Sequence, residues 1–303
     1  MEKVAGVGEG GEDSGFWEMQ ILETIAEVRG ALAGKERVVL VPTMGAIHAG
    51  HVALMEEARR LAGGEGIVVA SVFVNPTQFG PKEDFKSYPR DLEGDAGACE
   101  AAGVDVVFAP PVGEMYAEDA SVTVSEETLS MHLCGRSRPG HFAGVATVVL
   151  KLINIVRPDV AVFGKKDYQQ LAIIRRLVRD LNLEVEIVGV ETVREEDGLA
   201  MSSRNAYLTA EERAQAPVMR AALLSAAQAV KGGEVESKVL EEMVRERIAK
   251  DAPLGRVDYV NVVGGEDMQL VERVEGPTVM AMSVYFGKSR LIDNIEFDDG
   301  SGS

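Results

Sequence analysis

Two histidines, His48 and His51, have the type and spacing best suited to chemistry in this sequence. They follow an apolar run, Arg37–Val41, and open a segment with helical periodicity. A helix N-terminus offers unpaired N–H groups and partial positive charge, which suit a phosphate, and imidazoles add donors where charge develops on phosphorus. The spacing therefore predicts a nucleotide-phosphate site. Two alternatives stay open: one histidine caps the helix while the other is exposed, or the two bind a metal, although no third ligand cluster is suitably spaced.

A second candidate follows another apolar run, Val160–Phe163, and consists of Gly164, Lys165, Lys166 and Asp167. Lys166 can neutralise a phosphate, and Asp167 can accept hydrogen bonds from ribose hydroxyls. A turn with solvated lysines is the alternative. Because ligands of parallel sheets bind at the carboxyl ends of the strands, we expect this segment to lie near the histidines.

Two further polar segments could contact a ligand. In the run 198–205, two hydroxyls and an arginine could clamp a triphosphate, although an exposed linker is the alternative. Gln78 and Gln170 could bind a hydroxylated acid without adding charge, although Gln78 lies in what could be an ordinary loop. His132 and His141 are expected to be structural. Arg138 could bind a carboxylate or phosphate, or cap a helix.

The composition limits the function classes. The chain has 303 residues, with 31 Lys and Arg against 49 Asp and Glu, a net charge of −18. General nucleic-acid binding is excluded by this charge, so an anionic ligand must meet a local basic pocket or a bound cation. Cys99 and Cys134 are expected to be reduced thiols, since two cysteines make neither a disulfide framework nor a four-ligand zinc site. There is no apolar run of about 18 residues and no secretory signal, so we expect a soluble cytoplasmic protein without a membrane partner.

Apolar strands alternate with amphipathic helices through the first two thirds of the chain. This pattern predicts an α/β fold, a Rossmann-like parallel sheet with helices on both faces. The predicted strands are Arg37–Val41, Ile67–Val74, Val104–Phe108, Val122–Val124, Val160–Phe163 and Val185–Val190, and the predicted helices are His51–Gly64, Leu92–Ala102, Val145–Val156 and Tyr168–Leu181.

The pattern changes near residue 193, where we expect a hinge. Residues 1–15 read as a disordered tail, 16–192 as the Rossmann-like domain, and 193–303 as a smaller C-terminal α+β domain. The smaller domain is expected to have a helix capped by Thr209 and Glu212, a helix at Val235–Ala249, and strands at Val257–Val263, Thr278–Phe286 and Arg290–Phe297. Neither Gly6-x-Gly8-x-x-Gly11 nor Gly287-Lys288-Ser289 is a nucleotide motif, because the first lacks a preceding strand and the second has Met282 at the first glycine position. We expect the second to be a turn between strands with surface charges.

Taken together, these motifs resemble one family. V-P-T-M-G-A-I-H-A-G-H, F-V-N-P-T-Q-F-G, S-R-P-G-H-F-A-G-V, F-G-K-K-D-Y-Q-Q-L, D-G-L-A-M-S-S-R-N-A-Y-L and Y-F-G-K-S-R-L-I-D-N-I occur in order between about residues 20 and 297. They resemble the pantoate–β-alanine ligases (pantothenate synthetases) of the nucleotidyltransferase superfamily. Ile47 and Ala49 stand where the family often has Leu and Glu, and neither position must carry chemistry.

The resemblance implies a two-step reaction. ATP and (R)-pantoate give pantoyl adenylate and pyrophosphate with the help of Mg²⁺, and the amine of β-alanine then displaces AMP to form pantothenate, a precursor of coenzyme A. It also implies a homodimer. No protein ligand for Mg²⁺ follows from the resemblance, although Asp95 is conceivable.

The resemblance also assigns roles to individual residues. His51 is expected to be the proton donor, with His48 beside it on the phosphates. Lys166 and Arg204 complete the catalytic set, and Val193 contacts adenine. Gln78 and Gln170 bind pantoate, and Gln78 borders the β-alanine site. The ATP-binding residues would be Met44, Gly45, Ala46, Ile47, His48, Ala49, Gly50, His51, Gly164, Lys165, Lys166, Asp167, Val193, Met201, Ser202, Ser203 and Arg204.

Three other functions compete with this one. An adenylyltransferase could share the histidine motif but would need more basic residues for a phosphorylated acceptor. A nucleotide-binding regulatory protein without turnover would have no use for both histidines with Lys166 and Arg204. A metallohydrolase using His48 and His51 is the third alternative.

Overall fold

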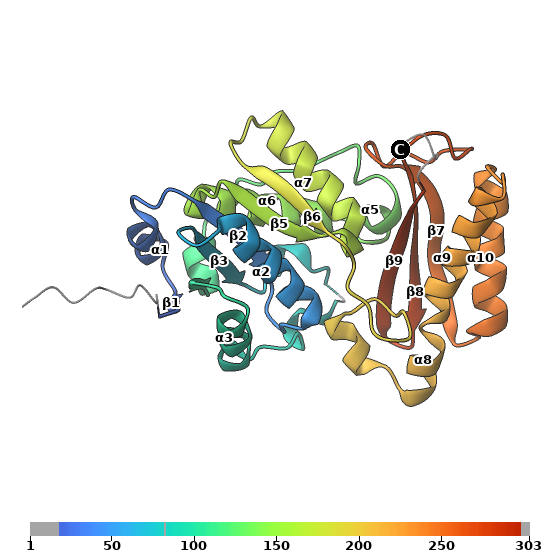
Figure 1. The fold of residues 1–303 in the computed structure, drawn as a ribbon, viewed down its shortest axis with the longest axis horizontal. Helices are drawn as coiled ribbons and strands as arrows, with labels where there is room; N and C mark the ends of the chain where they lie inside the picture. Colours follow the sequence, from blue (N-terminus) through green and yellow to red (C-terminus); the bar gives the residue numbers. More distant parts are fainter. Residues whose placement is uncertain (1–17, 82, 298–303) are drawn as a thin grey trace, which may run out of the picture.

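The fold is described from a computed structural model that covers residues 18–81 and 83–297 (Figure 1). The predicted tail at residues 1–15, with its glycine motif, lies outside the described residues. None of the helices within the described ranges is long and apolar enough to cross a bilayer.

Six parallel strands form the larger sheet, in the order β1-β4-β3-β2-β5-β6. The neighbouring strands β2 and β5 mark the point where the order reverses, because the chain leaves β2 for β3 on one side and β5 for β6 on the other. Ligands of open α/β sheets bind at the carboxyl ends of strands at such a point. The strands are β1 Gln20–Leu22, β2 Val38–Thr43, β3 Ile67–Val72, β4 Val106–Phe108, β5 Val160–Gly164 and β6 Glu186–Val190.

Helices cover both faces of this sheet (Figure 1). Val38 and Leu40 of β2 pack in one core with residues of α1, α6 and α7, whereas Val39 and Val41 pack in another with residues of α2 and α3. This alternation places apolar side chains on both faces, as expected for a doubly covered sheet. The helices are α1 Ile25–Leu32, α2 Ala49–Ala62, α3 Leu92–Ala101, α4 Val112–Met115, α5 Leu133–Ser137, α6 His141–Val156 and α7 Tyr168–Asp180.

A smaller antiparallel sheet, β7-β8-β9, follows, with a core of its own against α9 and α10. Its elements are α8 Ala210–Gln215, α9 Val218–Lys231, α10 Ser237–Asp251, β7 Gly255–Gly264, β8 Thr278–Phe286 and β9 Ser289–Phe297. Short 3₁₀ helices are η1 Pro76–Gln78, η2 Asp84–Lys86, η3 Lys165–Asp167 and η4 Ser203–Tyr207. The predicted α/β fold with a smaller α+β part is thus confirmed, as are the Thr209–Glu212 capping box and the turn at Gly287-Lys288.

Some predictions about elements were wrong. The strand predicted at Val122–Val124 is not one, because the Val124 N–H donates to the Thr147 hydroxyl of α6 (2.9 Å) rather than to a neighbouring strand. β1 and α1 were not predicted, since β1 is three residues long and mostly exposed. α6 begins at His141, four residues before the predicted Val145, directly after Gly140 in a left-handed conformation (φ 83°).

Candidate functional site

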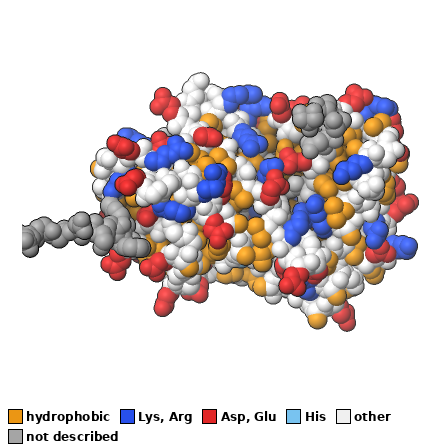
Figure 2. Space-filling model, viewed as in Figure 1, with side chains coloured by type: hydrophobic (Ala, Val, Ile, Leu, Met, Phe, Trp, Pro, Cys, Tyr) orange, Lys and Arg blue, Asp and Glu red, His pale blue; other side chains and the backbone are white. Residues whose placement is uncertain are grey.

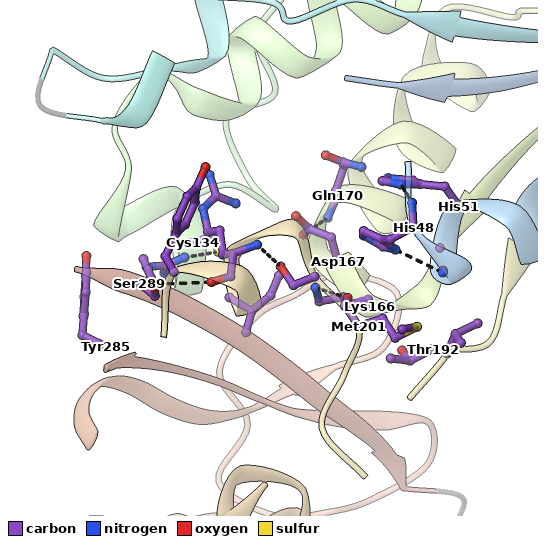
Figure 3. Close-up of a pocket in the computed structure, with 18 of the residues that line it drawn as sticks. His48, His51, Cys134, Lys166, Asp167, Gln170, Thr192, Met201, Tyr285 and Ser289 are labelled. Carbon is purple, nitrogen blue, oxygen red and sulfur yellow. Dashed lines mark hydrogen bonds between the residues drawn. The ribbon is translucent and has the colours of Figure 1, made fainter. Parts of the chain in front are cut away.

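A cleft of about 1240 Å³ lies between the carboxyl ends of the central parallel strands and the antiparallel sheet (Figure 3). The three predicted segments, around His48, Lys166 and Met201, meet there, and they are joined by the hairpin of β8 and β9, which was not predicted. The parallel-sheet side contributes His48, Gly50, His51, Gly164, Lys166, Asp167 and Gln170, the connecting segment contributes Val193, Met201, Ser202 and Arg204, and the hairpin of β8 and β9 contributes Tyr285, Lys288, Ser289 and Arg290.

The two histidines are fixed by main-chain hydrogen bonds at the start of α2. The Gly50 N–H donates to His48 Nδ1 (3.1 Å), and the His48 N–H donates to His51 Nδ1 (3.4 Å). Their rings stack with centroids 4.1 Å apart. Because both Nδ1 atoms accept, the proton of each neutral ring is on Nε2. His48 therefore caps the helix, as one alternative predicted, and each ring keeps an N–H donor.

Both rings are neutral near pH 7. Burial, with a smaller effect of the Lys166 charge, lowers the pKa of His48 to about 4. Burial, followed by the charges of His48 and Lys166, lowers the pKa of His51 to about 3. The pair therefore offers hydrogen-bond donors rather than fixed positive charges.

Asp95 of α3 stabilises the turn that precedes His48. This buried carboxylate accepts from the Ala46 N–H (3.0 Å) and the Ile47 N–H (2.8 Å). A side chain on Gly45 would meet Asp95 Oδ2 at 2.5 Å. Both oxygens of Asp95 therefore face the main chain, which argues against the idea that it holds Mg²⁺. The predicted ATP residues Met44, Gly45, Ala46, Ile47 and Ala49 belong to this supporting turn and are not among the side chains that line the cleft.

Lys166 links the second and third segments. Its Nζ donates to the Met201 carbonyl (2.6 Å), and burial, followed by the charge of Arg204, lowers its pKa to about 8. Asp167 caps α7 by accepting from the Gln170 N–H (3.2 Å). Lys165, by contrast, is not among the lining residues, and it pairs with Glu191, at the edge of the lining, and with Glu296 (2.5 and 2.9 Å).

The connecting segment folds back on itself beside Lys166. The Met201 N–H donates to the Val193 carbonyl (3.0 Å), and Ser202 Oγ accepts from the Arg204 N–H (3.3 Å) at the start of η4. Val193, Met201, Ser202 and Arg204 all line the cleft, whereas Ser203 is not among the lining residues. The run 198–205 is therefore part of the cleft wall rather than an exposed linker.

Gln170 lines the cleft. Gln78, the other residue predicted to bind pantoate, is buried and is not among the lining residues. The Gln78 amide donates to Met44 Sδ (2.9 Å) and accepts from Asn75 (3.1 Å). The main-chain carbonyl oxygen of Gln78 lies 2.8 Å from His141 Nδ1. Since Arg138 can only donate to His141 Nε2 (2.8 Å), Nδ1 carries the proton and donates to Gln78. His141 is thus structural, as predicted.

Arg138 lies in the cleft wall and forms a bidentate ion pair with Glu83, with both N···O distances 2.7 Å. Burial opposes ionisation of Glu83, but hydrogen bonds and charge from Arg138 outweigh it and lower its pKa to about 2. Arg138 is therefore a paired cation facing the cleft, and its main chain also forms the C-cap of α5, where its N–H donates to the Cys134 carbonyl (2.8 Å).

Sequence reasoning missed the contribution of the antiparallel sheet. The Gly287-Lys288-Ser289 turn was predicted as a turn with surface charges, and it is a turn, but it faces the cleft. Arg290 donates to Cys134 Sγ (3.2 Å) across the cleft wall and pairs with Asp258 (2.8 Å). A signal was available in the basic residues at positions 288 and 290, which stand out in an acidic chain.

The charge of the cleft differs from that of the whole chain. Its lining carries the cations Arg138, Lys166, Arg204, Arg256, Lys288 and Arg290 and the carboxylates Glu83, Asp167, Glu191 and Glu212. On the face in Figure 2, basic and acidic side chains are interspersed and form no continuous basic surface. Between residues 18 and 297, position 82 apart, no three His, Cys, Asp or Glu side chains converge as metal ligands. The cleft is thus a local basic pocket of the kind that the net charge requires for an anionic ligand.

Comparison with known proteins identifies the family. The model of the pantoate-beta-alanine ligase family matches residues 20–296. The pantothenate synthetase of Akkermansia muciniphila is 54% identical over 282 residues, 92% of this chain and 100% of that protein. The enzyme of Syntrophotalea carbinolica is 50% identical over 91% of this chain and 98% of that protein.

Solved structures agree with this result. Pantothenate synthetase from Thermus thermophilus superposes with a TM-score of 0.86 at 48% identity, covering 91% of this chain and 99% of that one. The pantoate-beta-alanine ligase from Francisella tularensis, complexed with beta-gamma ATP and beta-alanine, gives a TM-score of 0.74 at 30% identity and covers 92% and 97% of the two chains. With a family model over nearly the whole described chain and relatives of this identity, the chain belongs to the pantoate–β-alanine ligase family.

Proposed function

We propose that the cleft carries out both steps of the ligase reaction. The chain is an enzyme that condenses (R)-pantoate with β-alanine to pantothenate through a pantoyl-adenylate intermediate, releasing AMP and pyrophosphate. The observation that carries the site assignment is the meeting of His48 and His51, Lys166 and the Met201–Arg204 run in one cleft. The Francisella relative was solved with ATP and β-alanine compounds, which supports ATP as the nucleotide.

In the first step, a pantoate carboxylate oxygen attacks the α-phosphorus of ATP, and the bond to pyrophosphate breaks. Negative charge grows on the α-phosphate and on the leaving group. The Nε2–H groups of His48 and His51 and the N-terminus of α2 are aimed at that charge, with His51 as the principal donor. Lys166, on the same side of the cleft as the histidines, and Arg204, from the connecting segment, supply positive charge to the phosphates.

In the second step, the amine of β-alanine attacks the acyl carbon, loses a proton and displaces AMP. The side-chain amide of Gln170 is placed in the lining to hold pantoate for both steps. Gln78 is buried and bonded to Met44 Sδ, and we propose that it reaches the acid by giving up that hydrogen bond. Neutral amides orient a hydroxylated acid without cancelling the positive charge that the phosphates require.

A lid is part of this proposal. The acyl adenylate must be kept from water, and the part of the chain from residue 193 onward, with its own antiparallel sheet, forms the second wall of the cleft. We therefore assign residues 16–192 to nucleotide and pantoate binding and residues 193–303 to a lid hinged near Val193.

Mg²⁺ belongs to the proposal as an ion bound by the triphosphate. It usually keeps several waters and takes only one or two carboxylates besides the phosphates. Asp167, beside Lys166 in the lining, is the carboxylate placed to contribute one oxygen, while its Oδ1 caps α7. When bound, the ion neutralises phosphate charge.

We further propose a cytoplasmic homodimer, since the reaction consumes ATP and apolar side chains are exposed near residues 122–131. Val122 is 85% exposed and Met131 59% exposed. Light scattering of the wild-type chain and of Val122→Lys tests the dimer: a dimer that dissociates on substitution supports it, and a wild-type monomer contradicts it.

The reaction is tested with ATP and pantoate, with and without β-alanine. We expect pantoate-dependent exchange of pyrophosphate into ATP without β-alanine, and AMP with pantothenate when it is added. AMP transfer only to a phosphorylated acceptor would instead indicate an adenylyltransferase, and unaltered ATP would indicate a nucleotide-binding protein without turnover.

A further inference from the structure

We propose that Asn294, on β9, is a positioning residue for the adenylation step, because it fixes the main chain that carries Lys166. This inference rests on the proposed role of Lys166 at the phosphates of ATP. Asn294 lies in the closing L-I-D-N-I motif, to which the mechanism above gives no task.

The side chain of Asn294 reaches from one sheet to the other. Its Nδ2 donates to the carbonyls of two consecutive residues, Lys165 (2.9 Å) and Lys166 (3.0 Å). Those residues form η3 at the carboxyl end of β5, about 130 positions earlier in the sequence. Asn294 is only 8% exposed, so water cannot readily replace it as the donor. Both of its amide hydrogens are thus committed to the main chain next to the Lys166 side chain.

The neighbouring Asp293 fixes Asn294 in turn. Asp293 is 3% exposed; its Oδ1 accepts from the Asn294 N–H (2.8 Å), and its two oxygens form a bidentate pair with Arg194 (2.8 and 2.9 Å). Arg194 also donates to the Gly198 carbonyl (3.1 Å), in the turn before Met201. Lys166 then donates to the Met201 carbonyl (2.6 Å).

These contacts form a closed circuit of hydrogen bonds. It runs from β9 through the Lys166 main chain, across its side chain to the Met201 segment, and back through Arg194 to β9. β9 therefore sets the relative position of the two segments proposed to grip the triphosphate. Since a misplacement of about 1 Å can cost a rate of the order of 100-fold, loss of the two Asn294 bonds should lower adenylation by about 10- to 100-fold.

The test uses Asn294→Asp, which keeps the shape but cannot donate when ionised, and Asn294→Ala. Asn261→Ala is the matched control, because Asn261 lies in the same sheet on β7, donates to Glu241 of α10 (3.4 Å) and is not among the residues that line the cleft. Adenylation is measured as pantoate-dependent exchange of pyrophosphate into ATP, and the second step as the reaction of preformed pantoyl adenylate with β-alanine. Both Asn294 variants should lose about 10- to 100-fold in the first step and less than about threefold in the second. Asn261→Ala should change neither.

A double-mutant cycle then distinguishes an effect of Asn294 through Lys166 from an effect on the fold as a whole. In a Lys166→Met background, Asn294→Ala should lower adenylation no further, because Asn294 acts through Lys166. An undiminished effect in that background, or an equal loss in both steps, would overturn the proposal, as would wild-type exchange rates in Asn294→Asp.

If these variants do not fold, Asn294→Ser, with a smaller side chain that cannot reach both carbonyls, is measured in the same way. Absence of exchange in the wild-type protein would contradict the proposed function itself, which is a separate result from a wild-type enzyme that tolerates the loss of Asn294.

Discussion

The two sides of the cleft are stabilised in different ways. On the parallel-sheet side, the functional side chains are held mainly by hydrogen bonds to main-chain groups a few residues away. On the antiparallel-sheet side, the contacts join residues from distant parts of the sequence. His48 and His51 accept from N–H groups two and three residues away, and Asp167 caps its own helix. Across the cleft, Arg194 pairs with Asp293, and Asn294 holds residues 165 and 166.

The difference reflects the two kinds of element. A strand that leads directly into a helix brings a short run of residues to the helix N-terminus, so one motif contains both the chemical groups and their supports. An antiparallel hairpin presents alternate side chains to the cleft, and each must find a partner on another element. The positions of the functional groups on the parallel-sheet wall therefore follow mainly from local sequence, whereas those on the antiparallel-sheet wall depend on contacts that form only in the folded chain.

The sharpest test of the locally defined wall is His51→Ala. Removing one donor to charge in the transition state costs about 100-fold or more, roughly 3 kcal/mol. We therefore expect pantoate-dependent pyrophosphate exchange to fall by about that factor at pH 7.5 while the fold is retained. His48→Ala should have a similar effect. Exchange within about tenfold of wild type would show that the histidines do not act on the phosphates.

Asp95→Ala tests the long-range support of the turn that precedes His48. The substitution leaves the N–H groups of Ala46 and Ile47 without their buried acceptor, which costs about 2 kcal/mol of unfolding free energy. The loosened turn should also lower the exchange rate by about tenfold. Urea unfolding and the exchange assay measure the two effects.

Asp91→Ala is the control, because Asp91 caps the same helix, α3, by accepting from the Gly94 N–H at an exposed position. It should cost about 1 kcal/mol in stability with no change in rate. If Asp95→Ala also left the rate unchanged, the histidines would need no support from distant residues, and the contrast between the two sides of the cleft would be greater than proposed.

The same contrast explains how much could be predicted from the sequence. The strands and helices around His48 and Lys166, and the meeting of these residues at one sheet edge, followed from apolar runs and local motifs. Asp95 and Asn294 could not be assigned their roles, because their partners lie about 50 and 130 positions away. Gln78 was identified from its motif, but its burial behind Met44 depends on packing with α6 that no local pattern contains.

The histidines also predict a pH dependence of stability. Their folded-state pKa values, about 4 and 3, lie below the ordinary 6.5, so between these values the unfolded chain binds protons that the folded chain does not. Stability should thus be fully present above pH 6.5 and fall as the pH falls, by at most about 2 kcal/mol for His51 between pH 6.5 and 5. Urea unfolding at pH 7.5 and 5.0 measures the fall.

In His51→Gln that fall should be smaller. The pH range lies above the ordinary pKa values of carboxyl groups, so the difference between wild type and variant isolates the histidine. An identical pH dependence in the two proteins would show that His51 is not held neutral by the fold.

The smallest effect is expected for Arg213→Ala, on the antiparallel-sheet side. Arg213 of α8 pairs with Glu195 and Asp197, both at 2.6 Å, in the turn that precedes Met201. All three side chains are partly exposed, and such pairs contribute about 0.2–1 kcal/mol, less at high salt. The unfolding free energy should therefore change by less than about 1 kcal/mol, and the exchange rate by less than about twofold. Asn294 and Arg213 both support cleft residues from the antiparallel-sheet side, but of these two side chains only that of Asn294 is buried. A tenfold loss of rate in Arg213→Ala would show that exposed ion pairs also position the phosphate-binding run, and burial would no longer distinguish the supports of this wall.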